Sequence, residues 1–206
     1  MYKRALGALA GLALGDALGM PTQSMSPEQI RQHYNTITGL HDAVAEQPIA
    51  PSMPAGSITD DTEQALLLAG LLVEGGGRID PLRLAEALLS WEDDMRARGS
   101  LDLLGPSTKR ALERVRTGAD PRQTGREGTT NGAAMRVTPV GIAFRLGTTG
   151  DGLAQAVHES CLVTHDTRQG FEAAGLIAAA VSAAIDGADA ASALEAALSF
   201  VSAHPE

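Results

Sequence analysis

The segment SITDDTEQALLLAG, Ser57 to Gly70, places three carboxylates directly before an uninterrupted apolar run. The run is rich in alanine and leucine, which favour a buried helix. Thr59 or Asp60 could cap its first N–H groups, and the Asp60-x-x-Glu63 spacing resembles a capping box. Two carboxylates and a threonine hydroxyl also suit a hard cation such as Mg²⁺ or Mn²⁺. Both interpretations of these residues stay open at this point.

The rest of the chain repeats this helical character. Of 206 residues, 44% are hydrophobic but only 3% are aromatic, and small side chains let helix axes approach closely. We find no long strand with period-two alternation, no internal repeat and no domain linker. The composition predicts one all-α domain over residues 1–206 with seven or more helices. We expect helices over residues 1–20, 26–34, 61–74, 80–98, 106–118, 152–165, 168–186 and 190–203.

The first predicted helix carries glycines at every fourth position, Gly7, Gly11, Gly15 and Gly19. Such a stripe predicts close packing against another helix. The basic start and apolar run resemble a signal peptide, but Asp16 interrupts the run, and we judge it too short to span a bilayer. The sequence therefore predicts a cytoplasmic protein without a membrane segment.

Charge and cysteine content exclude several classes of protein. A formal net charge of −9 argues against general nucleic-acid binding, which needs clustered basic residues. The single cysteine, Cys161, excludes an internal disulfide and a cysteine-based zinc finger. Its setting in ESCLVTH predicts a buried small hydrophobe rather than a nucleophile.

Two loop motifs could contact a ligand. GTTNGAAMRVTPVG, Gly128 to Gly141, contains the strong turn signal Asn131-Gly132, whose free N–H groups could cradle a phosphate or simply form a buried turn. Pro139 in the same apolar segment excludes an unkinked helix through it. In LVTHD, His165 could contact a ligand phosphate or orient a neighbour, or it could be incidental beside a helix cap.

A further carboxylate, Asp102, precedes the turn Gly105-Pro106. It could face a pocket, although a solvated loop aspartate is the ordinary alternative. None of these motifs is decisive singly.

Together and in this order, the motifs resemble the ADP-ribosylglycohydrolase family. The matching blocks are GALAGLALGDALGMP (Gly7–Pro21), TDDTEQAL (Thr59–Leu66), LGPSTKRAL with TNGAAMRVTPVG (Leu104–Gly141) and LVTHD (Leu162–Asp166). The resemblance implies an all-α orthogonal multi-helix bundle that hydrolyses the glycosidic bond between ADP-ribose, or a related ribosyl group, and its acceptor. It also implies a Mg²⁺ or Mn²⁺ site, which is binuclear in the family.

The resemblance also implies roles for individual residues. Thr59, Asp60 and Asp61 match the metal ligands of the family, and Asp102 and Asp61 are the expected catalytic carboxylates. Asn131, Gly132, Met135 and His165 match residues that contact the ADP-ribose. The expected partners are ADP-ribose or an ADP-ribosylated acceptor.

Two departures from the family pattern qualify these expectations. Gln23 stands where many relatives carry a glutamate, and a neutral amide cannot act as a base. The GGDTDT-type block that supplies further metal ligands is absent, so we expect a domain that lacks the family's C-terminal helices and a doubtful second metal site. The alternatives are therefore a non-catalytic ADP-ribose or nucleotide-binding module, or a fragment that self-associates or needs a partner chain.

Overall fold

A computed structural model describes residues 1–100, 104–147 and 152–204. These residues form α-helices and two short 3₁₀ turns, with no strand among them. The helices are α1 (Tyr2–Gly19), α2 (Pro27–Tyr34), α3 (Asp60–Glu74), α4 (Pro81–Ala97), α5 (Pro106–Arg116), α6 (Gly132–Arg136), α7 (Thr138–Ala143), α8 (Gly152–Cys161), α9 (Arg168–Asp186) and α10 (Ala190–Ala203). The 3₁₀ turns are η1 (Met20–Thr22) and η2 (Pro121–Gln123). The all-α prediction is confirmed.

The helices begin where their capping residues predict. Ser26 accepts from the backbone N–H of Gln29, and the Gln29 side chain reaches back to the backbone N–H of Ser26, forming a complete capping box. Asp80 accepts from two backbone N–H groups at the start of α4, immediately before Pro81. At the far end of the chain, Asp189 caps α10 by accepting from the N–H of Ser192.

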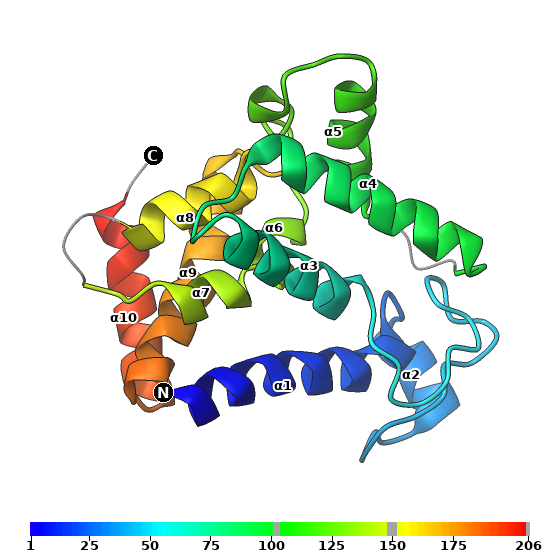
Figure 1. Ribbon diagram of the computed structural model, residues 1–206. Helices are drawn as coiled ribbons and strands as arrows, with labels where there is room; N and C mark the ends of the chain where they lie inside the picture. The colour runs from blue at the N-terminus through cyan, green and yellow to red at the C-terminus, as the bar shows by residue number, and fades with distance from the viewer. Residues whose placement is uncertain (101–103, 148–151, 205–206) are drawn as a thin grey trace.

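The core is built mainly around α9, which packs against α10, α8, α7 and α6. Figure 1 shows α9 and α10 side by side, with α1 crossing them at a steep angle, as the expected orthogonal arrangement requires. Alanines on α9 such as Ala174 and Ala178 are fully buried, so neighbouring helix axes can lie close. Cys161, which forms no disulfide, is also fully buried, as its sequence setting predicts.

The apolar segment around Pro139 is divided between two short helices. Helix α6 ends at Arg136 and α7 begins at Thr138, with Pro139 in its first turn. A proline is tolerated there because the first N–H groups of a helix have no intrahelical partner. The expectation that no plain helix runs through Pro139 is therefore confirmed.

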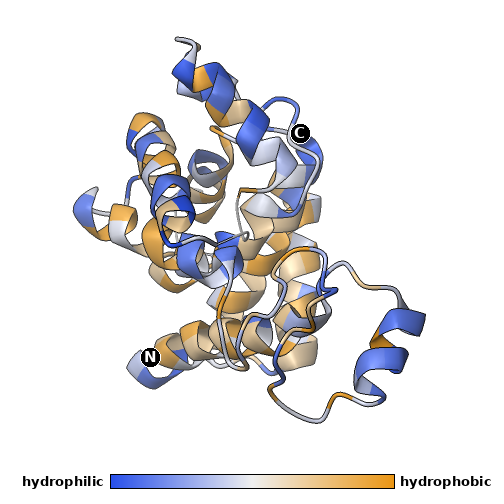
Figure 2. Cartoon of the chain, turned by 90° about the vertical axis from the view of Figure 1, so that its right-hand side faces the viewer, coloured by the Kyte–Doolittle hydropathy of each residue, from blue (hydrophilic) through white to orange (hydrophobic). Residues whose placement is uncertain are grey.

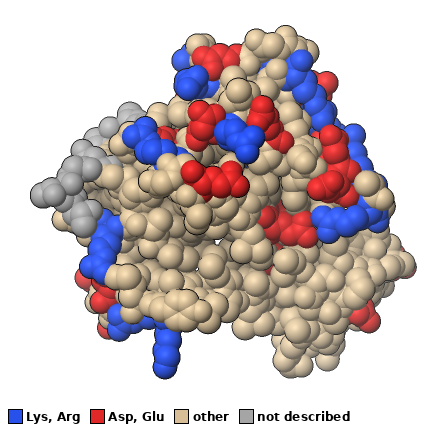
Figure 3. All heavy atoms as spheres, viewed as in Figure 1, with Lys and Arg blue, Asp and Glu red and all other residues tan. Residues whose placement is uncertain are grey.

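The glycine stripe of α1 does not pack against another helix, and that prediction is wrong. A Cβ added at Gly7, Gly11, Gly15 or Gly19 would meet nothing within 4 Å. Figure 3 shows an almost uncharged surface over α1 except near its beginning, and Figure 2 shows apolar colouring along the helix that starts at the N label. The stripe does not serve helix packing, because a Cβ at any of its glycines would meet open space and because Gly11, Gly15 and Gly19 border a hollow.

The length estimate for the first helix also needs correction. The segment Tyr2–Thr22 has 21 residues and is long and apolar enough to cross a bilayer, by length and composition only. Helix α1 itself lies within the expected range, and the apolar segment reaches Thr22 because η1, which contains Pro21, follows directly after Gly19. The same helix contacts α3, α7 and α9, so it is also packed as part of the bundle.

Candidate functional site

Two adjoining hollows form a cleft at the N-terminal end of α3. Their volumes are about 470 and 420 Å³. Both are bordered by Gln23, Asp61 and Asn131, which therefore lie where the two meet. The first also borders the glycine face of α1 through Gly11, Gly15 and Gly19, and the second extends to the N-terminal turn of α5 and to Gly132 and Met135. A glycine face leaves backbone surface open to a ligand because no Cβ stands on it.

Asp16 on α1 organises the start of α3. Its carboxylate accepts from the backbone N–H groups of Thr59 and Thr62, at 2.8 and 3.2 Å. It also accepts from the hydroxyls of the same two threonines, at 2.7 and 2.5 Å. An anion at a helix N-terminus satisfies free N–H groups and is favoured by the helix dipole. In the sequence Asp16 stands out only as a break in an apolar run, which does not indicate this role.

This arrangement settles the choice between the capping residues. Thr59 is the N-cap of α3, and its hydroxyl lies 3.5 Å from the backbone N of Asp61. Glu63 does not complete a capping box, because its carboxylate accepts from the indole N–H of Trp91 at 2.6 Å and from Arg98. The capping-box expectation is therefore wrong for Glu63. Local spacing could not reveal that α4 carries a tryptophan within its reach.

Asp60 and Asp61 are left with their carboxylates at the cleft. Asp60 is 8% exposed and accepts from the amide of Gln64 at 3.4 Å. Asp61 Oδ2 lies 3.3 Å from the hydroxyl oxygen of Thr59. Burial raises the pKa of Asp61 above its usual value, and the nearby charge of Asp16 adds to the effect. A carboxylate with a raised pKa holds a proton more readily, and a cation close to it would offset the cost of its negative charge.

The Asn131-Gly132 turn forms the opposite wall of the cleft. The hydroxyl of Thr167 donates to the carbonyl of Gly128 at 2.8 Å, and the N–H of Gly125 donates to the carbonyl of Leu162 at 3.1 Å. A Cβ at Gly132 would lie 2.6 Å from the His165 ring, so only glycine fits there. The structure thus brings Asn131, Gly132 and Met135 to the same cleft as Asp60 and Asp61.

His165 lies behind the cleft wall rather than on it. It is fully buried, and the cleft is lined instead by its neighbours Thr130 and Gly132. Its ring nitrogens lie 2.8 Å from the Thr164 hydroxyl and 2.9 Å from the Thr130 hydroxyl. Burial, with the charge of Arg136, lowers its pKa to about 4, so the ring is neutral at pH 7. The expected direct contact of His165 with a ligand is not what this geometry offers.

Gln23 and Asp102 are the remaining residues that the family resemblance places near the site. Gln23 borders both hollows, and its backbone carbonyl accepts from the side chain of Gln47 at 3.1 Å. Its Oε1 atom is buried and has no hydrogen-bond partner. Asp102 lies outside the described residues, so its expected catalytic role stays a prediction.

The donor atoms at the cleft suit one side of a hard-cation site. Thr59, Asp60 and Asp61 offer hydroxyl and carboxylate oxygens. Gln23, whose buried Oε1 has no hydrogen-bond partner, lines the same two hollows as Asp61. In the described part of the chain, no group of three or more histidine, cysteine or acidic side chains could hold an ion. By themselves these oxygens do not complete a cation site, so water or a ligand would have to supply the remaining positions.

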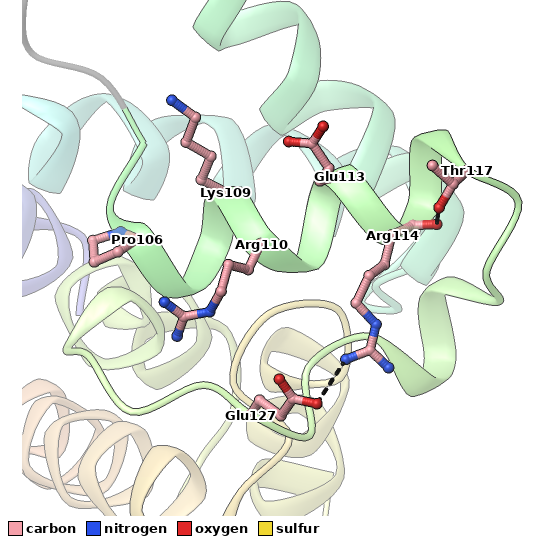
Figure 4. Close-up of a pocket in the computed structure, with 7 residues that line it drawn as sticks. All are labelled: Pro106, Lys109, Arg110, Glu113, Arg114, Thr117 and Glu127. Carbon is pink, nitrogen blue, oxygen red and sulfur yellow. Dashed lines mark hydrogen bonds and ion pairs between the residues drawn. The ribbon is translucent and has the colours of Figure 1, made fainter.

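A separate hollow lies along the outer side of α5. Figure 4 shows Lys109, Arg110 and Arg114 around it, with Glu113 and Glu127. Arg114 pairs with Glu127 across it at 3.2 Å. Pro106 borders both this hollow and the cleft, so the two are separated by the first turn of α5. Its charges are mixed, as on an ordinary solvated helix face.

The chain is similar to a known protein family and to several curated proteins. The family model described as ADP-ribosylglycohydrolase matches residues 1–206. An uncharacterized protein, YegU, of Escherichia coli (strain K12) is 36% identical over 185 residues, which cover 90% of this chain and 55% of the relative. The ADP-ribosylarginine hydrolase Tri1 of Pseudomonas putida (strain GB-1) is 33% identical over 195 residues, covering 90% of this chain and 48% of the relative.

A third relative carries a different acceptor in its name. The ADP-ribosyl-[dinitrogen reductase] glycohydrolase of Rhodospirillum rubrum is 35% identical over 146 residues, covering 69% of this chain and 45% of the relative. The chain thus spans about half the length of the curated relatives it matches.

Proposed function

The chain belongs to the ADP-ribosylglycohydrolase family, and from that premise we propose that it hydrolyses the glycosidic bond joining ADP-ribose to an acceptor. The observation that supports this most is the cleft itself. The cleft is lined by Asp60 and Asp61 at the start of α3 and by the Thr130–Gly132 turn. Acidic oxygens and a tight turn can therefore contact the same ligand. Two relatives are named for an ADP-ribosylated arginine and for ADP-ribosylated dinitrogen reductase, and these names support a protein side chain as the proposed acceptor.

The residues at the cleft suit the three tasks that this hydrolysis requires. The tight turn at Asn131-Gly132 lets the backbone approach a diphosphate, and the open glycine face of α1 leaves room for a sugar. Asp61 is the proposed base, because it borders both hollows and a carboxylate can take a proton from water. Asp60 is the proposed stabiliser of positive charge that develops at the anomeric carbon.

We further propose that the site takes Mg²⁺ or Mn²⁺, with Thr59, Asp60 and Asp61 as its protein ligands. When bound, such a cation would orient ribose hydroxyls and lower the pKa of water. Burial, and after it the charge of Asp16, raises the pKa of Asp61 in the cation's absence, and a cation would offset the repulsion between the two carboxylates, which supports this assignment.

The test is the release of ADP-ribose from an ADP-ribosylated arginine peptide, measured by chromatography. We expect release by the wild-type chain with Mg²⁺ or Mn²⁺ and a loss of about 100-fold or more in Asp61→Asn, the usual size of general-base effects. Asp94→Asn, an exposed carboxylate on α4, is the matched control and should behave as wild type. Equal rates in Asp61→Asn and wild type would refute the assignment of Asp61.

A second candidate function is ADP-ribose binding without hydrolysis. Gln23 favours this function, because it borders the cleft with a neutral amide. A base supplied from this position would need a carboxylate instead. Binding of ADP-ribose with no release from any substrate, together with a gain of release in Gln23→Glu, would identify this function.

A further inference from the structure

We infer that Arg136 is a positioning residue that sets the hydrogen-bond direction of the cleft wall, and that Thr130 thereby becomes a hydroxyl donor to an oxygen atom of the bound ligand. The inference deepens the proposed function, because it rests on a ligand occupying the cleft. It starts from an unbroken line of polar side chains through the core, which joins Asp60, Gln64, Arg136, Thr164, His165 and Thr130.

The centre of this line is a buried cation. Arg136 is 0% exposed, and so are Thr164 and His165. Its guanidinium donates to Gln64 Oε1 at 3.3 Å, to the carbonyl of Ser160 at 3.1 Å and to the Thr164 hydroxyl at 2.6 Å. A buried guanidinium is costly to place in a core, and its Nε has no partner at all. That cost indicates a task other than stability alone.

Arginine donates and never accepts, so it fixes the direction of each bond around it. Because Gln64 Oε1 accepts from Arg136, the Gln64 amide nitrogen faces Asp60 and donates to Oδ2 of that carboxylate. Asp60 also borders the cleft, so this bond fixes the orientation of a carboxylate in its wall. In this way Arg136 orients one wall without touching it.

The other branch runs toward the turn. Thr164 accepts from Arg136, and Nδ1 of His165, 2.8 Å away, is the acceptor that the described residues offer to the Thr164 proton, so we assign the proton to that bond. A neutral imidazole that accepts at Nδ1 carries its proton on Nε2, and that N–H points to the Thr130 hydroxyl at 2.9 Å. The Thr130 oxygen accepts this bond, which frees its proton for a third group.

Thr130 borders the cleft with Asn131 and Gly132, so the free proton faces the space that a ligand would fill. A sugar hydroxyl or a phosphate oxygen is the kind of acceptor that it would meet. Gly132 packs directly against the His165 ring, which holds the turn next to this line of polar side chains. The low pKa of His165, about 4, agrees with a ring that stays neutral while it donates to Thr130.

The first test needs no ligand. Long-range ¹H–¹⁵N correlation spectra of the wild-type chain at pH 7 report which ring nitrogen of His165 carries the proton. We expect the Nε2–H form, and we expect Thr164→Val to relax this preference while Thr164→Ser preserves it. A His165 ring protonated on Nδ1, or on both nitrogens, would overturn the inference whether or not the chain binds ADP-ribose.

The second test measures ADP-ribose affinity by calorimetry. Thr130→Val should weaken binding about tenfold, the usual effect of one lost hydrogen bond to a charged or polar ligand, and Thr130→Ser should restore it. Thr129→Val is the matched control, since this neighbouring side chain is exposed and does not border the cleft. Equal affinities of Thr130→Val and Thr129→Val would overturn the role of Thr130.

A third comparison separates positioning from mere packing. His165→Gln keeps an N–H near the position of Nε2, whereas His165→Asn is one methylene shorter and loses it. We expect affinity to survive in the first variant and fall in the second, and equal affinities would contradict the inference. Absence of binding by the wild-type chain would refute the proposed function and the ligand role of Thr130, and the spectra alone would then decide the role of Arg136.

Discussion

Replacing Asp16 with asparagine should destabilise the chain through the start of α3. The carboxylate of Asp16 accepts four hydrogen bonds, two from backbone N–H groups and two from hydroxyls of Thr59 and Thr62. An asparagine keeps one carbonyl oxygen, which can accept two of these bonds at most. At about 1 kcal/mol for each lost bond, Asp16→Asn should lower the free energy of unfolding by about 2 kcal/mol.

The alanine variant extends the scale. Asp16→Ala removes all four acceptor contacts and the favourable charge at the helix N-terminus, so its loss should reach about 4 kcal/mol. Urea titration followed by circular dichroism measures both values. The matched control is Asp189→Asn, an exposed N-cap that accepts a single bond from Ser192, because asparagine caps a helix about as well as aspartate does.

Asp189→Asn should therefore change the unfolding free energy by less than about 0.5 kcal/mol. If Asp16→Asn changed it as little as this control, Asp16 would not organise the start of α3, and the geometry assigned to Thr59 and Asp61 would lose its support.

Three further predictions concern the same site. The pKa of Asp61 in the folded chain is raised above 3.8, so as pH falls the folded chain binds a proton at Asp61 before the unfolded chain does. Proton binding at Asp61 therefore stabilises the fold at low pH, and this stabilisation is lost as pH rises through the folded pKa. Asp61→Asn should thus melt no lower than wild type at pH 7, and a clearly lower melting temperature would contradict the burial argument. His165 has the opposite sign: its folded pKa of about 4 lies below the usual 6.5, so the unfolded chain binds the proton first, and about 3 kcal/mol should be lost between pH 6.5 and 4. His165→Gln should flatten this part of the denaturation profile, and an unchanged slope would assign it to other groups. Gly132→Ala places a Cβ 2.6 Å from His165 Cε1 and should cost about 1–3 kcal/mol in urea titration, whereas Gly147→Ala would report only backbone strain away from the cleft.

Local chemistry explains why most helix boundaries could be predicted. Ser26 and Pro27, or Asp80 and Pro81, are signals read within one turn of chain, and they act the same way in the folded protein. Pro139 likewise breaks its segment for a reason internal to the backbone. The glycine stripe of α1 is different, because close packing depends on which face of the helix its partners contact, and α3, α7 and α9 do not contact the glycine positions closely.

The candidate site shows the same division. The family blocks identified Asp60, Asp61 and the Asn131-Gly132 turn, and the structure brings them to one cleft. Long-range contacts decided the rest. Glu63 turns to Trp91, 28 positions away, and His165 is buried behind Gly132 rather than exposed to a ligand. The role of Arg136 could not be foreseen, since its partners lie on α3, on α8 and in the segment after α8.

The central claim is that Thr59, Asp60 and Asp61 share one ligand site with the Thr130–Gly132 turn. Calorimetric titration of ADP-ribose into the wild-type chain, once with Mg²⁺ and once with EDTA, tests it most directly. We predict saturable binding with Mg²⁺ and a marked loss of affinity with EDTA. Absence of binding in both conditions would contradict the claim.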